Sequence, residues 1–332
     1  MKIPVRKSVA GMSGYVPGEQ PADGSLVKLN TNENPYPPSP RVAEAVTAEV
    51  AGAMNLYPRP MADELRSKAA EVYGLDPSQV LAGNGSDELL AIAVRAATVE
   101  GESLAFAEPT YSLYETLAAI AGAHVVALDE QARVTFVCNP NSPTGAAVPR
   151  QEIEAIAGGS EGIVIADEAY VDFGADTAIP LLDSYSNLLV VRSFSKSFSL
   201  AGLRLGLAFG DSALIAELAK VKDSYNVSRL AVAAGVAALD DYAWMQANVA
   251  RVKATRDRVV EELRGKGIRV ADSQANFFWM ECDGESGRSV HERLRAAGIL
   301  VRYFDRSDLA AGVRVTVGTD EQMDAFVAAL LG

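Results

Sequence analysis

The sequence has few of the residues that bind metal ions or form disulfides. Its 332 residues include only two cysteines, two histidines and two tryptophans. Cys138 and Cys282 lie far apart inside apolar segments, so we interpret them as buried free thiols, which fits the reducing cytoplasm. The first residues lack the apolar stretch of a secretory signal peptide. We therefore expect a cytoplasmic location.

Positive charge and long apolar runs are scarce too. There are 30 lysines and arginines against 43 aspartates and glutamates, which makes the formal net charge −13. Nucleic acids and anionic membranes attract proteins that carry a basic field, so we expect this chain to bind neither. No apolar run approaches the length of about 20 residues that crosses a membrane. Any bound anion must be held by a few local arginines and by backbone amides.

The sequence does have a repeated alternation of helical and strand patterns. Hydrophobic residues make up 49% and charged residues 22%, which is usual for a globular protein with a large core. Helical periodicity predicts helices over 61–73, 86–98, 111–121, 149–157, 212–224 and 241–264. Short apolar runs predict strands over 103–107, 124–128, 134–138, 163–166, 188–191 and 205–209. Because these runs lack polar alternation, they favour a mostly parallel α/β sheet that is covered on both faces.

The two ends of the chain differ from this middle part. Seven prolines within 1–40 predict an extended arm. The C-terminal part indicates a smaller α+β unit, with strands over 267–270, 275–280, 299–302 and 313–317 and helices over 289–297 and 320–331. We predict an arm over 1–27, which packs on the small domain or a partner subunit, a large domain over 28–230 and a small domain over 231–332.

One connection in the large domain is unusually short. Only five residues separate the apolar run that ends at Leu128 from the run that begins at Val134. A crossover between parallel neighbouring strands takes about a dozen residues or more. Either these two strands are not parallel neighbours or one of the two strand assignments is wrong.

A single lysine lies beyond the end of one predicted strand. Lys196 follows the apolar run 188–191, among several serines and eight residues before Arg204. In a partly dry pocket a lysine loses its proton more easily and forms a Schiff base with an aldehyde. Ser193, Ser195 and Arg204 are groups that a phosphate needs nearby. An aldehyde site beside a phosphate site suggests pyridoxal phosphate (PLP).

Four more polar segments directly follow other apolar runs, over 83–88, 108–111, 139–145 and 167–170. Ligands of open α/β sheets bind beyond the carboxyl ends of the strands, so we expect all five segments to meet at one site. The first segment is a glycine-rich turn into a helix, where the amides of Ser86 and Asp87 could hold a phosphate or Ser86 could simply cap the helix. Its glycine spacing matches neither a Walker loop nor a dinucleotide fingerprint, which argues against a dehydrogenase.

Other residues of these segments allow more than one interpretation. Asp167 is a structural cap, a metal ligand or the partner of a protonated ring nitrogen, and the lack of a nearby histidine disfavours the metal. Asn141 either belongs to a tight turn or bonds a ring substituent, and Tyr111 is a core residue or a stacking platform. Arg314 is either a solvated edge residue or a bidentate clamp for an anionic group.

Taken together, these segments resemble the fold-type-I PLP-dependent aminotransferases, and most closely their histidinol-phosphate aminotransferase branch. Each motif alone is weak, so the resemblance depends on the order and spacing of the motifs over nearly the whole chain. The segments are 15–19, 29–35, 55–58, 83–88, 109–111, 139–145, 167–170, 193–204 and 314–318. The resemblance implies a large, mostly parallel sheet domain and a smaller α+β domain. The chain departs from it at Ser197 and Ser199, where smaller residues are common, and at the short link after Leu128.

The resemblance also implies a role for individual residues. Lys196 would bind PLP covalently and act as the general base, while Asp167 would pair with the ring nitrogen. Asn141 and Tyr170 would bond the ring hydroxyl, and Tyr111 would stack on the ring. The cofactor phosphate would be bound by Ser86, Asp87, Ser193, Ser195, Arg204 and Tyr57 of the partner subunit, which implies a homodimer. The substrate would be bound by Tyr15, Tyr225, Asn226, Arg302 and Arg314.

The implied reaction is a transamination that interconverts histidinol phosphate and 2-oxoglutarate with imidazole-acetol phosphate and glutamate, in histidine biosynthesis. Tyr15, Tyr225 and Phe198 do not exclude an aromatic amino-acid aminotransferase on the same scaffold, and a phosphothreonine decarboxylase is a remoter alternative. In a different class, a binding protein could keep this fold without the chemistry. The intact set of lysine, aspartate and arginine argues against such a non-catalytic protein.

Overall fold

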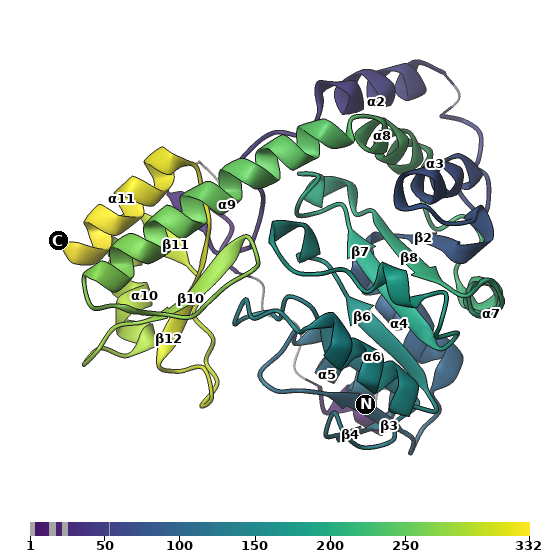
Figure 1. Ribbon diagram of the computed structural model, residues 1–332, viewed down its shortest axis with the longest axis horizontal. Helices are drawn as coiled ribbons and strands as arrows, with labels where there is room; N and C mark the ends of the chain where they lie inside the picture. The colour runs from purple at the N-terminus through teal and green to yellow at the C-terminus, as the bar shows by residue number, and fades with distance from the viewer. Residues whose placement is uncertain (1–3, 13–17, 22–25, 53) are drawn as a thin grey trace.

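The computed structural model describes residues 4–12, 18–21, 26–52 and 54–332 (Figure 1). A seven-stranded sheet with the strand order β2-β8-β7-β6-β5-β3-β4 forms its centre. These strands are β2 (Val80–Gly83), β3 (Ser103–Phe106), β4 (His124–Val126), β5 (Val134–Cys138), β6 (Ile163–Asp167), β7 (Leu188–Ser193) and β8 (Gly206–Gly210). Within this sheet β8 alone runs antiparallel to its neighbours, so the predicted mostly parallel sheet is confirmed.

Helices lie around this sheet, and the last one of the following series extends away from it (Figure 1). They are α1 (Lys7–Ala10), α2 (Pro40–Gly52), α3 (Asp63–Tyr73), α4 (Gly85–Ala97), α5 (Leu113–Ala121), α6 (Arg150–Gly159), α7 (Ser212–Val221), α8 (Arg229–Asp240) and α9 (Tyr242–Gly265). The proline-rich region predicted to be extended contains α1, and α2 begins at its last residue. Ser39 accepts a hydrogen bond from the amide of Arg41 at 3.2 Å, and Pro40 takes the first helical position. This start signal was missed in the sequence because the prolines before it dominate the pattern.

The side chains of β7 show why the central strands are apolar at every position. Leu188 and Val190 enter the core on one face of the sheet, which they share with α6. Leu189 and Val191 enter the core on the other face, which they share with α4. All four side chains are fully buried. A strand that is covered on both faces gains from an apolar residue at each position, and this holds the carboxyl end of β7 rigidly in place.

The short link after Leu128 joins two strands that are not neighbours. Strand β3 lies between β4 and β5 and pairs in parallel with both. The expectation that these two strands are not parallel neighbours is therefore confirmed. Within the link, the amide of Glu130 donates to the carbonyl of Ala127 at 3.1 Å, and residues 127–133 contain no helix.

The C-terminal part of the chain forms a smaller α+β unit. It contains an antiparallel sheet with the order β12-β10-β9, while β11 pairs in parallel with β1 from the N-terminal side. The elements are β1 (Val27–Leu29), β9 (Arg269–Val270), β10 (Phe277–Glu281), β11 (Ile299–Val301), β12 (Gly312–Thr316), α10 (Gly287–Ala296) and α11 (Asp320–Leu331). In Figure 1 the long helix α9 connects the large sheet to this unit. The domain limits after residues 27 and 230 stay predictions.

No helix in the described part of the chain is both long enough and apolar enough to cross a membrane.

Candidate active site

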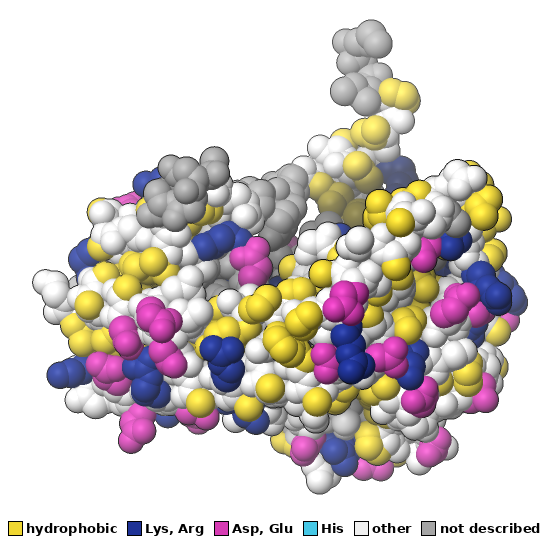
Figure 2. Space-filling model, turned by 90° about the horizontal axis from the view of Figure 1, so that it is seen from above, with side chains coloured by type: hydrophobic (Ala, Val, Ile, Leu, Met, Phe, Trp, Pro, Cys, Tyr) yellow, Lys and Arg dark blue, Asp and Glu magenta, His cyan; other side chains and the backbone are white. Residues whose placement is uncertain are grey.

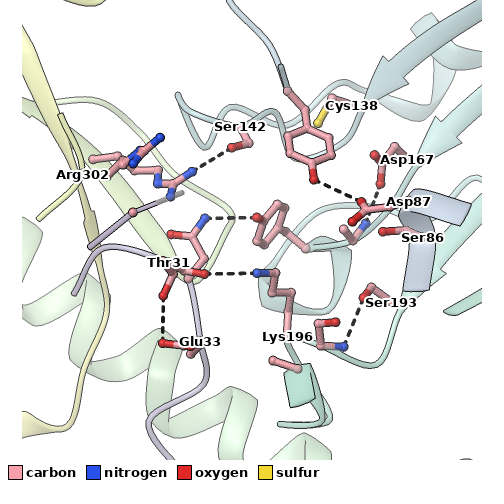
Figure 3. Close-up of a pocket in the computed structure, with 18 of the residues that line it drawn as sticks. Thr31, Glu33, Ser86, Asp87, Cys138, Ser142, Asp167, Ser193, Lys196 and Arg302 are labelled. Carbon is pink, nitrogen blue, oxygen red and sulfur yellow. Dashed lines mark hydrogen bonds between the residues drawn. The ribbon is translucent and has the colours of Figure 1, made fainter. Parts of the chain in front are cut away.

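A cavity of about 260 Å³ lies where the carboxyl ends of the central strands face the C-terminal unit (Figure 3). Asp167 at the end of β6 and Ser193 at the end of β7 line it from the large sheet. Arg302 and Arg314 line it from the C-terminal unit, and Thr31 lines it from the segment after β1. The strand ends therefore converge on one site, as the sequence predicted.

Lys196 lies in the loop after β7, with its amine inside this cavity. Its Nζ atom donates to the backbone carbonyl of Thr31 at 3.4 Å and lies 5.5 Å from the ring centroid of Tyr170. Burial and, to a smaller extent, the positive charge of Arg314 together lower the pKa of the Lys196 amine from 10.5 to about 8. At pH 7 about a tenth of such an amine is uncharged, far more than for an ordinary lysine, and a nucleophile or a general base requires this uncharged form.

Asp167 is only 3% exposed and sits on the opposite side of the cavity from the lysine loop. The hydroxyl of Tyr114 donates to its Oδ2 atom at 2.8 Å, and the amide of Ala169 donates to its Oδ1 atom at 3.2 Å. Burial raises the pKa of the Asp167 carboxyl to about 6, although both hydrogen bonds oppose that shift. A buried carboxylate of this kind gains from a cationic ligand group placed against it.

The neighbouring acidic residue belongs to a separate buried cluster. The guanidinium of Arg192 forms ion pairs with Glu168 at 3.1 Å and with Asp172 at 2.9 Å. The hydroxyl of Ser197 donates to Asp172 at 2.6 Å. This departure from the family pattern therefore anchors the loop that carries Lys196 to the buried cluster. Ser199 adopts a left-handed backbone with φ of 61°, and its buried hydroxyl has no partner among the described residues. Nothing in the structure explains a serine there.

The residues predicted to bind a phosphate meet at the start of α4. The amides of Ser86 and Asp87 belong to the free N-terminus of this helix, which favours an anion. Arg204 lies beside them, and its guanidinium donates to Ser195 at 3.2 Å and to Asp87 at 3.1 Å. Ser193 completes this corner of the cavity, with its hydroxyl accepting from the amide of Ser195 at 3.1 Å.

Two glycines allow this phosphate corner to be so compact. A Cβ atom at Gly85, where φ is 80°, would lie 2.8 Å from a guanidinium nitrogen of Arg204. A Cβ atom at Gly206 would lie 2.7 Å from the amide nitrogen of Ser86. Side chains at either position would push the arginine or the strand β8 away from the helix N-terminus. The donor set of amides, hydroxyls and one guanidinium fits the phosphate group of PLP.

Two tyrosines, Tyr111 and Tyr170, also line the cavity. The Tyr111 hydroxyl donates to Asp87 at 3.1 Å, which fixes its ring at the cavity wall. The Tyr170 hydroxyl accepts from the side-chain amide of Asn32 at 3.1 Å. Burial raises the pKa of the Tyr170 hydroxyl, so it remains a neutral donor at physiological pH.

The structure places Ser142, rather than Asn141, at the cavity wall. The Asn141 side chain donates to the carbonyl of Pro109 at 3.0 Å and to Thr144 at 2.9 Å, and it accepts from Thr110 at 2.8 Å. The bond to Thr144 lies within the turn, whereas the bonds to Pro109 and Thr110 tie the turn to the segment that follows β3. The Ser142 side chain is buried, lines the cavity and accepts from Arg314 at 3.1 Å. The sequence indicated that a polar residue of this turn lines the cavity. It did not indicate whether that residue is Asn141 or its neighbour Ser142.

Arg302 and Arg314 form the opposite wall together. Their backbones pair across an isolated bridge, and their guanidinium carbons lie 5.2 and 5.4 Å from the ring centroid of Phe304. Arg314 also donates to the carbonyl of Asn30 at 3.0 Å. It faces away from the buried Val313 and Val315 of β12, but into the cavity rather than into bulk solvent. The two guanidinium groups give this wall its positive charge.

The remaining predicted residues lie elsewhere. Tyr57 is 78% exposed and stacks on Tyr225 with the ring centroids 4.5 Å apart, beside α2 and α8 and outside the cavity. The side-chain amide of Asn226 donates to Glu88 at 2.8 Å and to a carbonyl of β2 at 3.1 Å. Tyr15 lies outside the described residues. Among the described residues, no group of three or more His, Cys, Asp or Glu side chains could hold a metal ion.

Sequence reasoning missed the polar residues that follow β1. Thr31 and Glu33 line the cavity, where Thr31 donates to Glu33 at 2.9 Å and Lys28 forms an ion pair with Glu33. Asn32 reaches Tyr170 from the same segment. The segment 29–35 belongs to the family resemblance, but no role was assigned to its residues, because the three-residue strand before it gives too little periodicity to be recognised as a strand end.

The chain belongs to the aminotransferase class I and II family, whose model it matches over residues 25–330. It is similar to the histidinol-phosphate aminotransferase of Citrifermentans bemidjiense, with 43% identity over 99% of this chain and 98% of that one. It is also similar to that of Syntrophotalea carbinolica, with 44% identity over 98% of both chains. The crystal structure of the Sinorhizobium meliloti histidinol-phosphate aminotransferase in complex with pyridoxal-5'-phosphate shares its fold, with a TM-score of 0.88 at 23% identity over 99% and 97% of the two chains.

Proposed function

We propose that this protein is a PLP-dependent aminotransferase that interconverts histidinol phosphate and 2-oxoglutarate with imidazole-acetol phosphate and glutamate, as a step of histidine biosynthesis. One observation carries the proposal: a half-buried lysine with a pKa of about 8 shares a cavity with a buried aspartate and a phosphate corner. The family match supports transamination, and relatives at 41–44% identity over nearly the whole chain support the substrate.

The residues present fit PLP. When bound, PLP supplies an aldehyde that reacts with amines and a pyridine ring that withdraws electrons from the substrate carbon. The amides of Ser86 and Asp87, with Ser193, Ser195 and Arg204, would hold its phosphate. Asp167 would face the ring nitrogen, Tyr111 would pack on the ring, and Tyr170 would bond the ring hydroxyl. Ser142, which lines the cavity and is bonded to Arg314, would bond that hydroxyl in place of Asn141.

The proton transfers rest on residues of this chain. The uncharged Nζ atom of Lys196 would take the proton from the substrate carbon that bears the amine and would then deliver a proton to the former aldehyde carbon of the cofactor. Thr31 orients that amine through its carbonyl at 3.4 Å. Asp167 keeps the proton on the ring nitrogen, because a carboxylate that is ionised above a pKa of about 6 pairs with a cation at neutral pH.

The two arginines of the C-terminal unit would bind the anionic end of each substrate. A phosphate monoester and a carboxylate both accept paired N–H bonds from a planar guanidinium. Arg302 and Arg314 lie side by side, so histidinol phosphate and 2-oxoglutarate can be held at the same wall in turn. Tyr225 and Asn226 do not line the cavity of a single chain, and with Tyr15 they remain proposed substrate residues of the assembled enzyme.

A homodimer is part of the proposal, with Tyr57 of the partner subunit reaching the cofactor phosphate. Within one chain Tyr57 is 78% exposed, and Val50, Met54 and Leu56 around it are exposed apolar side chains. Figure 2 looks down on the side that carries α2 and α8, where hydrophobic side chains gather among charged ones. Burying such a patch against a second copy would stabilise the pair. The free cysteines Cys138 and Cys282 fit the proposed cytoplasmic location.

A substrate panel tests the proposal. Purified protein loaded with PLP is given histidinol phosphate, phenylalanine or phosphothreonine, each with 2-oxoglutarate, and glutamate formation is followed. We expect kcat/KM for histidinol phosphate to exceed that for phenylalanine by at least about tenfold, which corresponds to 1.4 kcal/mol. A preference for phenylalanine would establish the aromatic alternative. A protein that binds PLP but does not complete either half-reaction would be non-catalytic, and the proposal would fall.

A further inference from the structure

The hydroxyl of Tyr114 contacts the Asp167 carboxylate directly. The Tyr114 side chain comes from α5, is fully buried, and donates its hydroxyl hydrogen to the Oδ2 atom of Asp167 at 2.8 Å. The amide of Ala169 occupies the other oxygen, Oδ1, at 3.2 Å. No sequence motif includes Tyr114, and the proposed reaction does not use it. A buried hydroxyl aimed at the carboxylate that faces the cofactor ring calls for a functional explanation.

Aromatic packing holds this hydroxyl in one place. The Tyr114 ring stacks on Phe136 of β5, with centroids 4.3 Å apart and an angle of 7° between the planes. The ring of Tyr111 meets its edge at 5.7 Å and 84°, and Phe106 packs on it at 5.9 Å. Rotation of the Tyr114 side chain would break all three contacts. The oxygen of the hydroxyl is therefore fixed relative to both Asp167 and the stacking residue Tyr111.

The surroundings also determine the direction of the hydrogen bond. Burial raises the pKa of the Tyr114 hydroxyl well above its ordinary value, so the group stays neutral. Burial raises the pKa of the nearby Cys138 thiol to about 12, so no thiolate competes for the hydrogen. Tyr114 can then only act as a neutral donor towards the ionised carboxylate. Hydrogen bonds to charged groups are stronger than those between neutral groups, and they stabilise the ionised form of the acceptor.

We propose that Tyr114 is a positioning residue that keeps Asp167 ionised and thereby keeps the proton on the ring nitrogen of PLP. Without the donor, Asp167 would keep only the hydrogen bond from Ala169 besides its pairing with the ring, and the carboxylate would take a larger share of the proton that it otherwise leaves on the ring. A ring without that proton withdraws electrons less strongly, which slows the reaction without removing any group that touches the substrate. This inference rests on the proposed function, because it requires bound PLP.

The test compares wild-type holoenzyme with Tyr114→Phe, both loaded with PLP that carries ¹⁵N in its ring. Phenylalanine keeps the stack on Phe136 and removes only the donor. We expect the ¹⁵N resonance to move from the protonated towards the unprotonated position, the Kd for PLP to rise several-fold and kcat to fall by about tenfold. Tyr185→Phe is the matched control, since it removes a surface hydroxyl that donates to Glu154 at 3.3 Å, and it should leave the resonance unchanged.

A second variant separates the donor from the packing. Replacing Tyr114 by 3-fluorotyrosine adds an atom to the packed ring but retains the hydroxyl, so we expect the ¹⁵N resonance of wild type. An unshifted resonance in Tyr114→Phe, or an equal shift in the fluorinated variant, would overturn the role of the donor. If the wild-type protein takes up no PLP, the proposed function itself fails, which is a different result from an unshifted resonance in a protein that binds PLP.

Discussion

The two walls of the cavity are built in different ways. The wall predicted to hold the cofactor comes from the ends of adjacent strands, with Asp167 on β6 and Ser193 on β7. The wall predicted to hold the substrate combines Arg302 and Arg314 of the C-terminal unit with Thr31, which is far from them in sequence. The first wall is positioned by a sheet that is buried on both faces. The second depends on how the C-terminal unit packs against that sheet, so it can vary while the first stays constant.

Removing the lysine should give the largest difference between the effects on the cofactor wall and on the substrate wall. We expect Lys196→Ala to lower kcat by about 10²–10⁴-fold, because both the covalent attachment and the general base are lost. The absorbance of the lysine-linked cofactor should vanish, while the affinity for substrate analogues that bind the arginine wall should hold. Lys220→Ala, on the exposed face of α7, is the control and should behave as wild type. Full activity in Lys196→Ala would refute the assignment of the cofactor wall.

Replacing the buried aspartate should stabilise the protein while it damages catalysis. The pKa of Asp167 in the folded protein is about 6, above its ordinary value of 3.8, so its ionisation costs folding free energy as the pH rises from about 4 to above 6. We expect Asp167→Asn to raise the free energy of unfolding of PLP-free protein at pH 8 by up to about 3 kcal/mol and to leave it nearly unchanged below pH 4. Urea unfolding at both pH values checks this, and an unstable variant at pH 8 would contradict it.

The arginine wall should affect substrate binding more than cofactor binding. We expect Arg302→Met and Arg314→Met each to raise KM for histidinol phosphate by about 10–100-fold, because a charge-assisted bond to the phosphate is lost. The Kd for PLP should change by less than about threefold. Arg302→Lys keeps the charge without the planar fork and should give an intermediate KM. Equal losses in KM and in PLP affinity would show that the two walls are not independent.

The rate of PLP uptake should report the pKa of the lysine. An amine whose pKa is lowered from 10.5 to about 8 is half uncharged at about pH 8, so uptake by the PLP-free protein should accelerate up to that pH and then level off. Arg314→Met removes a positive charge that disfavours the protonated amine, so we expect the midpoint to move upwards. Stopped-flow absorbance between about pH 6 and 10 measures both curves. A midpoint near 10 in wild type would contradict the buried position of Lys196.

The smallest expected effect distinguishes two adjacent residues. We expect Ser142→Ala to weaken PLP binding by a few-fold, because it removes a hydroxyl that lines the cavity and accepts from Arg314. Asn141→Ala removes three hydrogen bonds, one within its turn and two to the segment after β3, so it should lower the melting temperature while changing PLP binding less. The melting temperature and the PLP titration of both variants decide which residue serves the cofactor wall. The reverse pattern would return that role to Asn141.

Sequence reasoning reached the cofactor wall because it depends on local patterns. An apolar run followed at once by a polar residue marks a buried strand and its end, so Asp167 and Lys196 were both predicted at their observed places. The turn over 139–145 was predicted, but the orientation of its side chains was not. Asn141 and Ser142 are adjacent polar residues, and only the backbone of the folded turn decides which of them points towards the cavity. Helix α2 and strand β1 were missed, since prolines and a three-residue strand give little periodicity.

The sequence by itself determined the class of chemistry. A lysine among phosphate-binding groups, placed at a strand end, limits the protein to a narrow set of reactions because those residue types have few other joint uses. Only the tertiary structure decided which side chains share the cavity. It places Thr31 and Arg314, which lie near opposite ends of the sequence, in the same cavity. It also places the Tyr114 hydroxyl within hydrogen-bond distance of Asp167. The reason is physical: burial and hydrogen-bond direction are properties of packed elements, and no local pattern of residues encodes them.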